Sequence, residues 1–180
     1  NTATWPLAAQ QPTLPPPLAG DRGRLLAVGR LVEQKGFDIL IDVFARLCRD
    51  LPDWQLVILG EGPEREALEA KVAAAGLAER ILLPGRAGNV GEWYAASSLY
   101  VMSSRFEGFP NTLAEAMAYG LPAVSFDCDT GPRDIIRHEV DGLLVQVASL
   151  DVIIASKEWA DRPKDRAALP ELRRLRDAER

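Results

Sequence analysis

Two glutamates in the segment RFEGFPNTLAEAMAYG, residues 105–120, have a spacing that lets both face one ligand. Glu107 lies in a loop beside Gly108, and Glu115 follows after seven intervening residues, one turn into an alanine-rich helix pattern. Carboxylates accept hydrogen bonds from sugar hydroxyls, and the free backbone N–H groups at a helix N-terminus bind phosphate. Phosphate and hydroxyl recognition in one segment indicate a nucleotide sugar as the ligand.

A pair of cations lies in the stretch GRLVEQKGFD, where Arg30 and Lys35 are flanked by Gly29 and Gly36. Arginine binds phosphate as a bidentate fork and lysine as a point charge, so together they fit a diphosphate. Their spacing alone favours two solvated surface cations. Because both follow a predicted strand, as the Glu107 loop does, we prefer the phosphate interpretation.

Six apolar runs alternate with helical patterns along the chain. The predicted strands are residues 24–29, 54–60, 80–84, 99–102, 122–126 and 142–145. Their continuous apolar character, without alternation, is typical of a parallel sheet covered by helices on both faces. The sequence therefore predicts one doubly wound, Rossmann-like α/β domain, whose ligands bind beyond the carboxyl ends of the strands.

The composition divides the chain into three segments. Residues 1–22 include PTLPPPLAG, which we interpret as an interdomain linker that takes no part in the core. Residues 23–146 are predicted to form the nucleotide-sugar-binding domain. Residues 147–180 are rich in charge with a thin leucine stripe, and we interpret them as a solvated helix or tail without an assigned function. The first residue is Asn, which suggests a part of a longer protein.

Composition and motifs argue against several classes of protein. The net charge of −5 gives no general attraction to nucleic acid or to an anionic membrane, and no apolar run approaches 18 residues. Cys48 and Cys128 lack metal-ligand spacing and imply no disulfide framework, so a reducing cytosol is expected. His138 is interpreted as a surface loop residue. The chain has no GxGxxG after its first predicted strand and no GxxxxGK[ST], which disfavours dinucleotide dehydrogenases and P-loop NTPases.

Four segments together resemble the C-terminal, donor-binding half of retaining GT-B glycosyltransferases of family 4 (group 1). They are VGRLVEQKGFD, LGEGP, SSRFEGFPNTLAEAMAYGLPAV and TGPRDIIRHEVDGLLV, in the family's order over residues 24–146. FDCDTGPRDII further resembles bacterial members that build cell-surface or lipid-linked glycans from UDP-hexoses or UDP-N-acetylhexosamines. The chain departs from the family in lacking its N-terminal acceptor-binding domain, and QVASLDVIIASKEWADRP matches the family's continuation poorly.

This resemblance implies a role for each matching residue. Arg30 and Lys35 would hold the donor diphosphate and stabilise the leaving nucleotide. Glu107 would contact the donor sugar and Glu115 the ribose. Together Arg30, Lys35 and Glu107 would carry the catalysis, without a metal ion or cofactor, through electrostatic stabilisation of the leaving group.

The resemblance adds donor contacts through the backbone and near the base. Backbone amides would bind the sugar and the distal phosphate. They are those of Gly108, Phe109, Asn111 and Thr112. Further donor-site positions are Gly29 in the first turn, and Gly85 and Arg86 near the base.

The resemblance also sets the expected partners. They are a UDP-sugar and the missing N-terminal domain, in a cytoplasmic enzyme whose full-length form is compatible with peripheral association at the inner face of the membrane. The isolated chain is expected to bind donor weakly and to transfer little. Two alternatives stay open: a sugar-nucleotide epimerase of GT-B shape, and a non-catalytic α/β domain that binds a protein partner.

Overall fold

A computed structural model of the chain describes residues 6–17, 23–128, 131–145 and 170. The chain divides into two compact units, residues 1–145 and residues 146–180. The charged C-terminal segment predicted for residues 147–180 lies outside the described residues, apart from Pro170.

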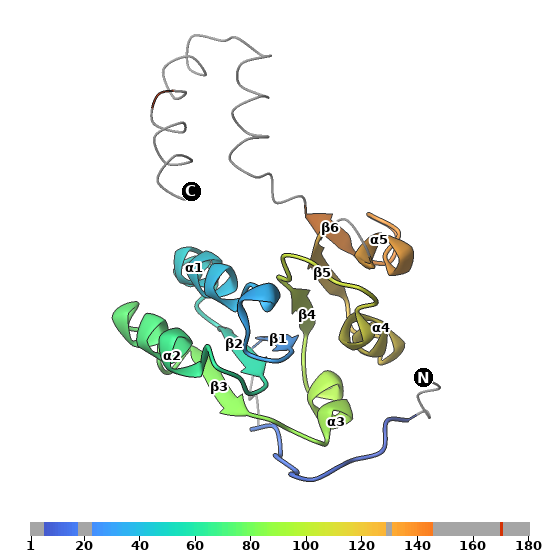
Figure 1. Ribbon diagram of the computed structural model, residues 1–180, viewed down its shortest axis with the longest axis horizontal. Coiled ribbons are helices and arrows are strands. Elements are labelled where there is room, and N and C mark those ends of the chain that lie inside the picture. Colours follow the sequence, from blue (N-terminus) through green and yellow to red (C-terminus); the bar gives the residue numbers. More distant parts are fainter. Residues whose placement is uncertain (1–5, 18–22, 129–130, 146–169, 171–180) are drawn as a thin grey trace. The chain divides into compact units, whose positions relative to one another are not determined.

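The first unit is built on a six-stranded sheet in which every neighbouring pair is parallel (Figure 1). The strands are β1 (Gly23–Val28), β2 (Trp54–Leu59), β3 (Ile81–Gly85), β4 (Leu99–Met102), β5 (Ala123–Phe126) and β6 (Leu143–Val145). Their order across the sheet is β3-β2-β1-β4-β5-β6. The predicted doubly wound α/β, Rossmann-like fold is therefore confirmed.

The helices alternate with the strands and cover both faces of the sheet (Figure 1). They are α1 (Phe37–Leu47), α2 (Arg65–Ala74), α3 (Val90–Ala95), α4 (Asn111–Ala118) and α5 (Pro132–Ile135), with a short 3₁₀ helix η1 (Glu33–Lys35) before α1. In the described residues, no helix has both the length and the apolar character needed to cross a membrane.

Alternating side chains of the central strands belong to two hydrophobic cores. Leu26 of β1 packs with Val57 of β2 and Tyr100 of β4 in the core that α3 and α4 complete. The next residue of β1, Ala27, packs instead in the core formed with α1 and α2. Because successive side chains of a strand point to opposite faces, each strand must be apolar on both sides. This explains the continuous apolar runs in the sequence.

Gly36 ties the turn after β1 to the end of β4. Its φ angle of +63° lies in the left-handed region, and it directly precedes the first residue of α1. A Cβ atom at this position would lie 2.1 Å from the carbonyl oxygen of Ser103. The turn after β1 and the segment after β4 therefore meet at a spacing that only glycine permits.

The proline-rich segment contributes to the core, so the prediction that it takes no part in the core is wrong. Leu14 is partly buried against the α3–α4 core, and its carbonyl accepts a hydrogen bond from Trp93 Nε1 at 2.7 Å. The backbone N–H of Gln10 donates to the Gly88 carbonyl at 2.8 Å, and the backbone N–H of Gly88 donates to the Pro12 carbonyl at 2.7 Å. Proline has no N–H group, but the carbonyls of an extended proline-rich chain remain available as acceptors.

Candidate functional site

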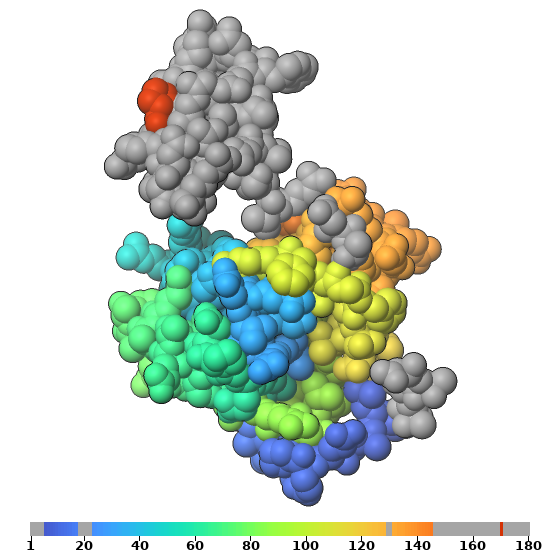
Figure 2. Space-filling view, in the orientation of Figure 1, coloured from blue at the N-terminus to red at the C-terminus, as the bar shows by residue number. Residues whose placement is uncertain are grey.

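The carboxyl ends of the strands lie along one rim of the sheet, and the order in which strands are added reverses at β1. After β1 the chain moves outward to β2 and β3, and it then returns to the other side of β1 as β4. In doubly wound sheets, ligands bind where the loops that follow two such strands separate. The segments that follow β1 and β4 are therefore the candidate site, and they lie against each other in Figure 2.

Lys35 and Glu107 form an ion pair at this switch point. Lys35 is the last residue of η1, after β1, and its Nζ lies 2.5 Å from Oε1 of Glu107, after β4. Their side chains are 21% and 8% exposed, so the carboxylate is nearly buried. Ser104 Oγ donates to the same Oε1 at 2.6 Å. Ser104 was not among the predicted site residues, and its sequence signal is a polar side chain two residues after a buried strand.

Hydrogen bonds join the segments after β1 and β4 on both sides of this ion pair. Arg105 N donates to the Gln34 carbonyl at 2.8 Å, and Gln34 Nε2 donates to the Phe106 carbonyl at 2.9 Å. Ser103 Oγ donates to the Lys35 carbonyl at 2.9 Å. These bonds fix the backbone on either side of Lys35 and Glu107. The two side chains therefore extend from loops that are hydrogen-bonded to each other.

Arg105 serves the structure of these loops. Its guanidinium forms a bidentate pair with Asp38 at 2.7 and 2.9 Å and donates to the Glu33 carbonyl. The hydrogen bond from Arg105 lowers the pKa of the Asp38 carboxyl, and Asp38 in turn raises the pKa of Arg105. Arg105 is thus engaged by the start of α1, whereas Lys35 is in contact with Glu107.

Arg30 has different surroundings from Lys35. It is exposed and lines a cavity of about 380 Å³ at the carboxyl ends of β1 and β2, together with Gly29 and Arg86. Lys35 is not among the lining residues. The structure therefore brings Arg30 and Arg86, predicted for the phosphates and the base, to one cavity, and places Lys35 beside Glu107.

Gly85 borders this region from β3. It is the buried last residue of the strand, with a φ angle of +107°, and a Cβ there would lie 3.0 Å from Oε1 of Glu61. Glu61 also lines the cavity, and its carboxylate is paired with Arg65 of α2. Neither Glu61 nor Arg65 was predicted as a site residue.

The loop before α4 presents the other predicted contacts. Gly108 and Phe109 are exposed, and α4 begins at Asn111 without a side-chain cap within the described residues. A Cβ on Gly131, whose φ is +92°, would lie 2.5 Å from the Gly108 carbonyl oxygen. The segment after β5 thus supports this loop, and the N-terminus of α4 keeps its partial positive charge.

Glu115 has a partner inside the protein. Its half-buried carboxylate accepts a hydrogen bond from the Tyr94 hydroxyl at 3.1 Å, a contact that no pattern in the sequence predicts. Thr112 lies one turn earlier on α4, and its Oγ1 accepts a bond from Tyr100 at 2.8 Å. Glu107 and Glu115 are therefore held by different elements, the first by the turn after β1 and the second by α3.

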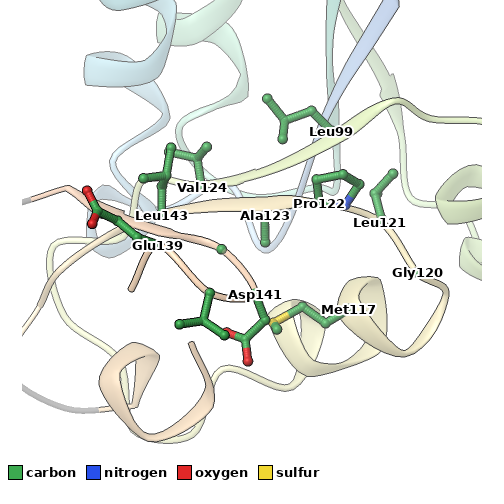
Figure 3. Close-up of a pocket in the computed structure, with 12 residues that line it drawn as sticks. Leu99, Met117, Gly120, Leu121, Pro122, Ala123, Val124, Glu139, Asp141 and Leu143 are labelled. Carbon is green, nitrogen blue, oxygen red and sulfur yellow. The ribbon is translucent and has the colours of Figure 1, made fainter. Parts of the chain in front are cut away.

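A larger cavity lies away from the predicted residues. Its volume is about 660 Å³, and it is lined by the first residues of β4, β5 and β6, which are Leu99, Ala123 and Leu143 (Figure 3). The amino ends of these strands are at the opposite edge of the sheet from the Lys35–Glu107 pair. No predicted site residue lines this cavity.

The sheet order and the rim define the chain as a Rossmann-like domain with its candidate ligand site at the β1–β4 switch point. Within that class, the chain belongs to the glycosyl transferases group 1 family, whose model matches residues 15–170. This confirms the coarser part of the resemblance to glycosyltransferases.

Named relatives act in the synthesis of bacterial surface glycans. The amylovoran biosynthesis glycosyltransferase AmsD of Erwinia amylovora is 37% identical over 147 residues, covering 78% of this chain and 41% of AmsD. The lipopolysaccharide 1,6-galactosyltransferase of Salmonella typhimurium is 34% identical over 157 residues, covering 81% of this chain and 42% of that protein. The chain thus spans less than half the length of these relatives.

Solved structures that are similar to this chain include GT-B glycosyltransferases. The pneumococcal O-GlcNAc transferase GtfA, determined in complex with UDP and GlcNAc, superposes with a TM-score of 0.67 at 26% identity. The match covers 87% of this chain and 29% of GtfA. The Rossmann-like architecture of this chain is similar to that of a GT-B glycosyltransferase, which agrees with the prediction of one half of a GT-B fold.

Proposed function

We propose that the chain is the donor-binding, C-terminal half of a retaining glycosyltransferase. The full enzyme would transfer a hexose or an N-acetylhexosamine from a UDP-sugar to an acceptor hydroxyl in bacterial surface or lipid-linked glycan synthesis. The family membership and the relatives in amylovoran and lipopolysaccharide synthesis support the reaction class. GtfA and an Anabaena protein, HepE, were both determined with UDP, which supports the choice of nucleotide.

The ion pair of Lys35 and Glu107 is the observation that carries this proposal. In a nucleotide sugar the anomeric carbon is bonded to the distal phosphate, so anionic oxygens and sugar hydroxyls lie next to each other. A cation that binds phosphate and a carboxylate that accepts from hydroxyls match this arrangement when they are in contact. Lys35 Nζ and Glu107 Oε1 are 2.5 Å apart at the switch point, where such a ligand is expected.

The chemistry asked of these residues is stabilisation of a leaving group. Transfer breaks the bond between the anomeric carbon and a phosphate oxygen, forms a bond to the acceptor oxygen, and releases UDP and the hydroxyl proton. Negative charge grows on the departing diphosphate, and Lys35 and Arg30 are the cations proposed to stabilise it. Glu107 would orient the sugar by accepting hydrogen bonds from its hydroxyls. No metal ion is required in this proposal.

The rest of the enzyme is proposed to lie in the part that this chain lacks. Since the chain spans less than half of its named relatives, the acceptor site is assigned to a separate N-terminal domain. We place the full enzyme in the cytoplasm, with peripheral contact at the inner face of the membrane. Residues 1–22 are proposed as an interdomain linker that packs against the donor domain through Leu14. Residues 23–146 are proposed as the donor domain, and residues 147–180 as a charged tail.

Calorimetry and turnover of the purified 180-residue chain test the proposal. Saturable binding of UDP with little transfer activity is the expected result. Absence of binding at millimolar UDP would contradict it and favour a partner-binding domain. Epimerisation of UDP-N-acetylglucosamine without an acceptor would favour the epimerase. Full transfer activity of the isolated chain would show that no further domain is needed.

A further inference from the structure

The hydroxyl of Tyr94 lies between two acceptors on the first turns of α4. Tyr94 belongs to α3 and is 1% exposed, and its single hydroxyl proton is shared between Oε2 of Glu115 at 3.1 Å and the carbonyl of Thr112 at 3.2 Å. Thr112 and Glu115 are three residues apart, so they lie on the same face of the helix. The Tyr94 hydroxyl of α3 therefore contacts this face of α4 from the side.

The ring of Tyr94 is fixed by two other tyrosines. It meets Tyr100 edge-on at 6.1 Å between ring centroids, and it packs against Tyr119 at 5.5 Å with an interplanar angle of 38°. A ring enclosed in this way points its hydroxyl in one direction. Burial also raises the pKa of Tyr94 above its ordinary value, so the phenol stays protonated and remains a donor near neutral pH.

We propose that Tyr94 is a positioning residue that holds Glu115 for recognition of the ribose hydroxyls of the donor nucleotide. This inference rests on the proposed function, in which Glu115 binds the ribose. It adds a residue on another helix whose own side chain does not touch the ligand.

The geometry explains why such a residue is needed. A glutamate on a helix surface has several rotamers, and ordering it when a ligand binds costs conformational entropy. The bond from Tyr94 selects one arrangement beforehand and occupies one lone pair of Oε2. In the described part of the chain, Oε1 of Glu115 makes no hydrogen bond. Oε1 and the remaining lone pair of Oε2 can then accept from two neighbouring hydroxyls.

Binding of UDP and of 2′,3′-dideoxy-UDP to the full 180-residue chain tests this inference by calorimetry. The wild type should bind UDP more tightly than the dideoxy analogue. Tyr94→Phe keeps the ring contacts and removes only the hydroxyl, so UDP should weaken about three- to tenfold, the effect of one hydrogen bond. Affinity for the dideoxy analogue should not change, because that ligand has no ribose hydroxyls to present to Glu115.

Tyr100→Phe is the matched control. It removes a buried tyrosine hydroxyl from the same cluster, and that hydroxyl donates to Thr112 Oγ1 and not to Glu115. The ratio of UDP to dideoxy-UDP affinities should stay at the wild-type value in this variant. In a Glu115→Gln background, Tyr94→Phe should cause a smaller loss than it does in the wild type.

Three results would overturn the inference. Equal weakening of both ligands by Tyr94→Phe would show a structural role only. Weakening of UDP by Glu115→Gln, with no effect of Tyr94→Phe, would leave the ribose role of Glu115 intact and remove Tyr94 from it. Failure of the wild type to bind UDP would reject the proposed function and this inference together.

Discussion

Lys35 Nζ and Glu107 Oε1 lie 2.5 Å apart although the two residues are 72 positions apart in the chain. Their contact joins the segment after β1 to the segment after β4, the two strands at which the order of the sheet reverses. The nearly buried carboxylate also accepts from Ser104, so its charge is compensated from both segments. This ion pair is both a structural link and the proposed centre of donor recognition.

Removing Lys35 should destabilise the fold through the carboxylate left behind. Lys35→Met leaves Glu107 nearly buried without the Lys35 ammonium, and we expect a loss of about 1–3 kcal/mol in the free energy of unfolding. The double variant Lys35→Met, Glu107→Gln should recover part of this loss, because the neutral amide can still accept from Ser104. Urea unfolding of the four proteins of this cycle measures the coupling. Additive effects would mean that the ion pair contributes nothing.

Arg30→Ala should weaken UDP binding without changing stability. Loss of one charged hydrogen bond to a phosphate costs about 1.5–3 kcal/mol, which is roughly tenfold or more in affinity. Arg46→Ala is the control, since Arg46 is an exposed cation in the last turn of α1. Calorimetry with UDP compares the two variants. Equal affinities would remove Arg30 from the phosphate site.

Glu107→Gln should distinguish UDP-sugar from UDP. The carboxylate is assigned to the sugar hydroxyls, so its neutral replacement should reduce affinity for the UDP-sugar more than affinity for UDP. The matched comparison is Glu115→Gln, which should weaken both ligands because both contain ribose. Competition binding with UDP and UDP-N-acetylglucosamine gives the two ratios. If Glu107→Gln weakened both ligands and Glu115→Gln weakened mainly the UDP-sugar, Glu107 would be assigned to the ribose and Glu115 to the sugar.

Alanine substitutions at Gly36 and Gly76 distinguish the cost of a left-handed backbone from the cost of a steric clash, because the two glycines have similar φ angles. Gly76 has a φ of +68°, and a Cβ placed there would meet nothing within 4 Å, whereas Gly36 has a φ of +63° and the Ser103 carbonyl 2.1 Å from such a Cβ. Gly76→Ala should therefore cost only the left-handed strain, about 1–2 kcal/mol. Gly36→Ala should cost more and should also weaken UDP binding, because it separates the segments after β1 and β4. Thermal unfolding and calorimetry check both expectations.

Leu14→Asp should lower the stability of the described domain. The side chain is partly buried against the α3–α4 core, so a carboxylate there loses apolar contact and is partly desolvated. We expect a cost of at least about 1 kcal/mol, and a change within about 0.5 kcal/mol for the exposed control Thr13→Asp. Equal stabilities in urea would restore the interpretation of residues 6–17 as a free linker.

The identity of the elements was predictable because their signals are local. Continuous apolar runs marked all six strands, and helical spacing marked α1, whose buried residues Phe37, Leu40, Ile41 and Phe44 follow the 3.6-residue period. The strand-to-turn alternation also placed Arg30, Lys35 and Glu107 on one rim. The role of residues 6–17 was missed, since packing of Leu14 and acceptance by its carbonyl depend on a distant helix.

The sequence by itself determined the fold class, the rim and the types of side chain that reach it, because apolar period and turn chemistry act over a few neighbouring residues. Only the tertiary structure decided that Lys35 contacts Glu107, that Arg30 lines a cavity with Arg86, and that Tyr94 donates to Glu115. Each of these contacts depends on which strands become neighbours in the sheet. That choice is made by burial over the whole domain, and no local pattern encodes it.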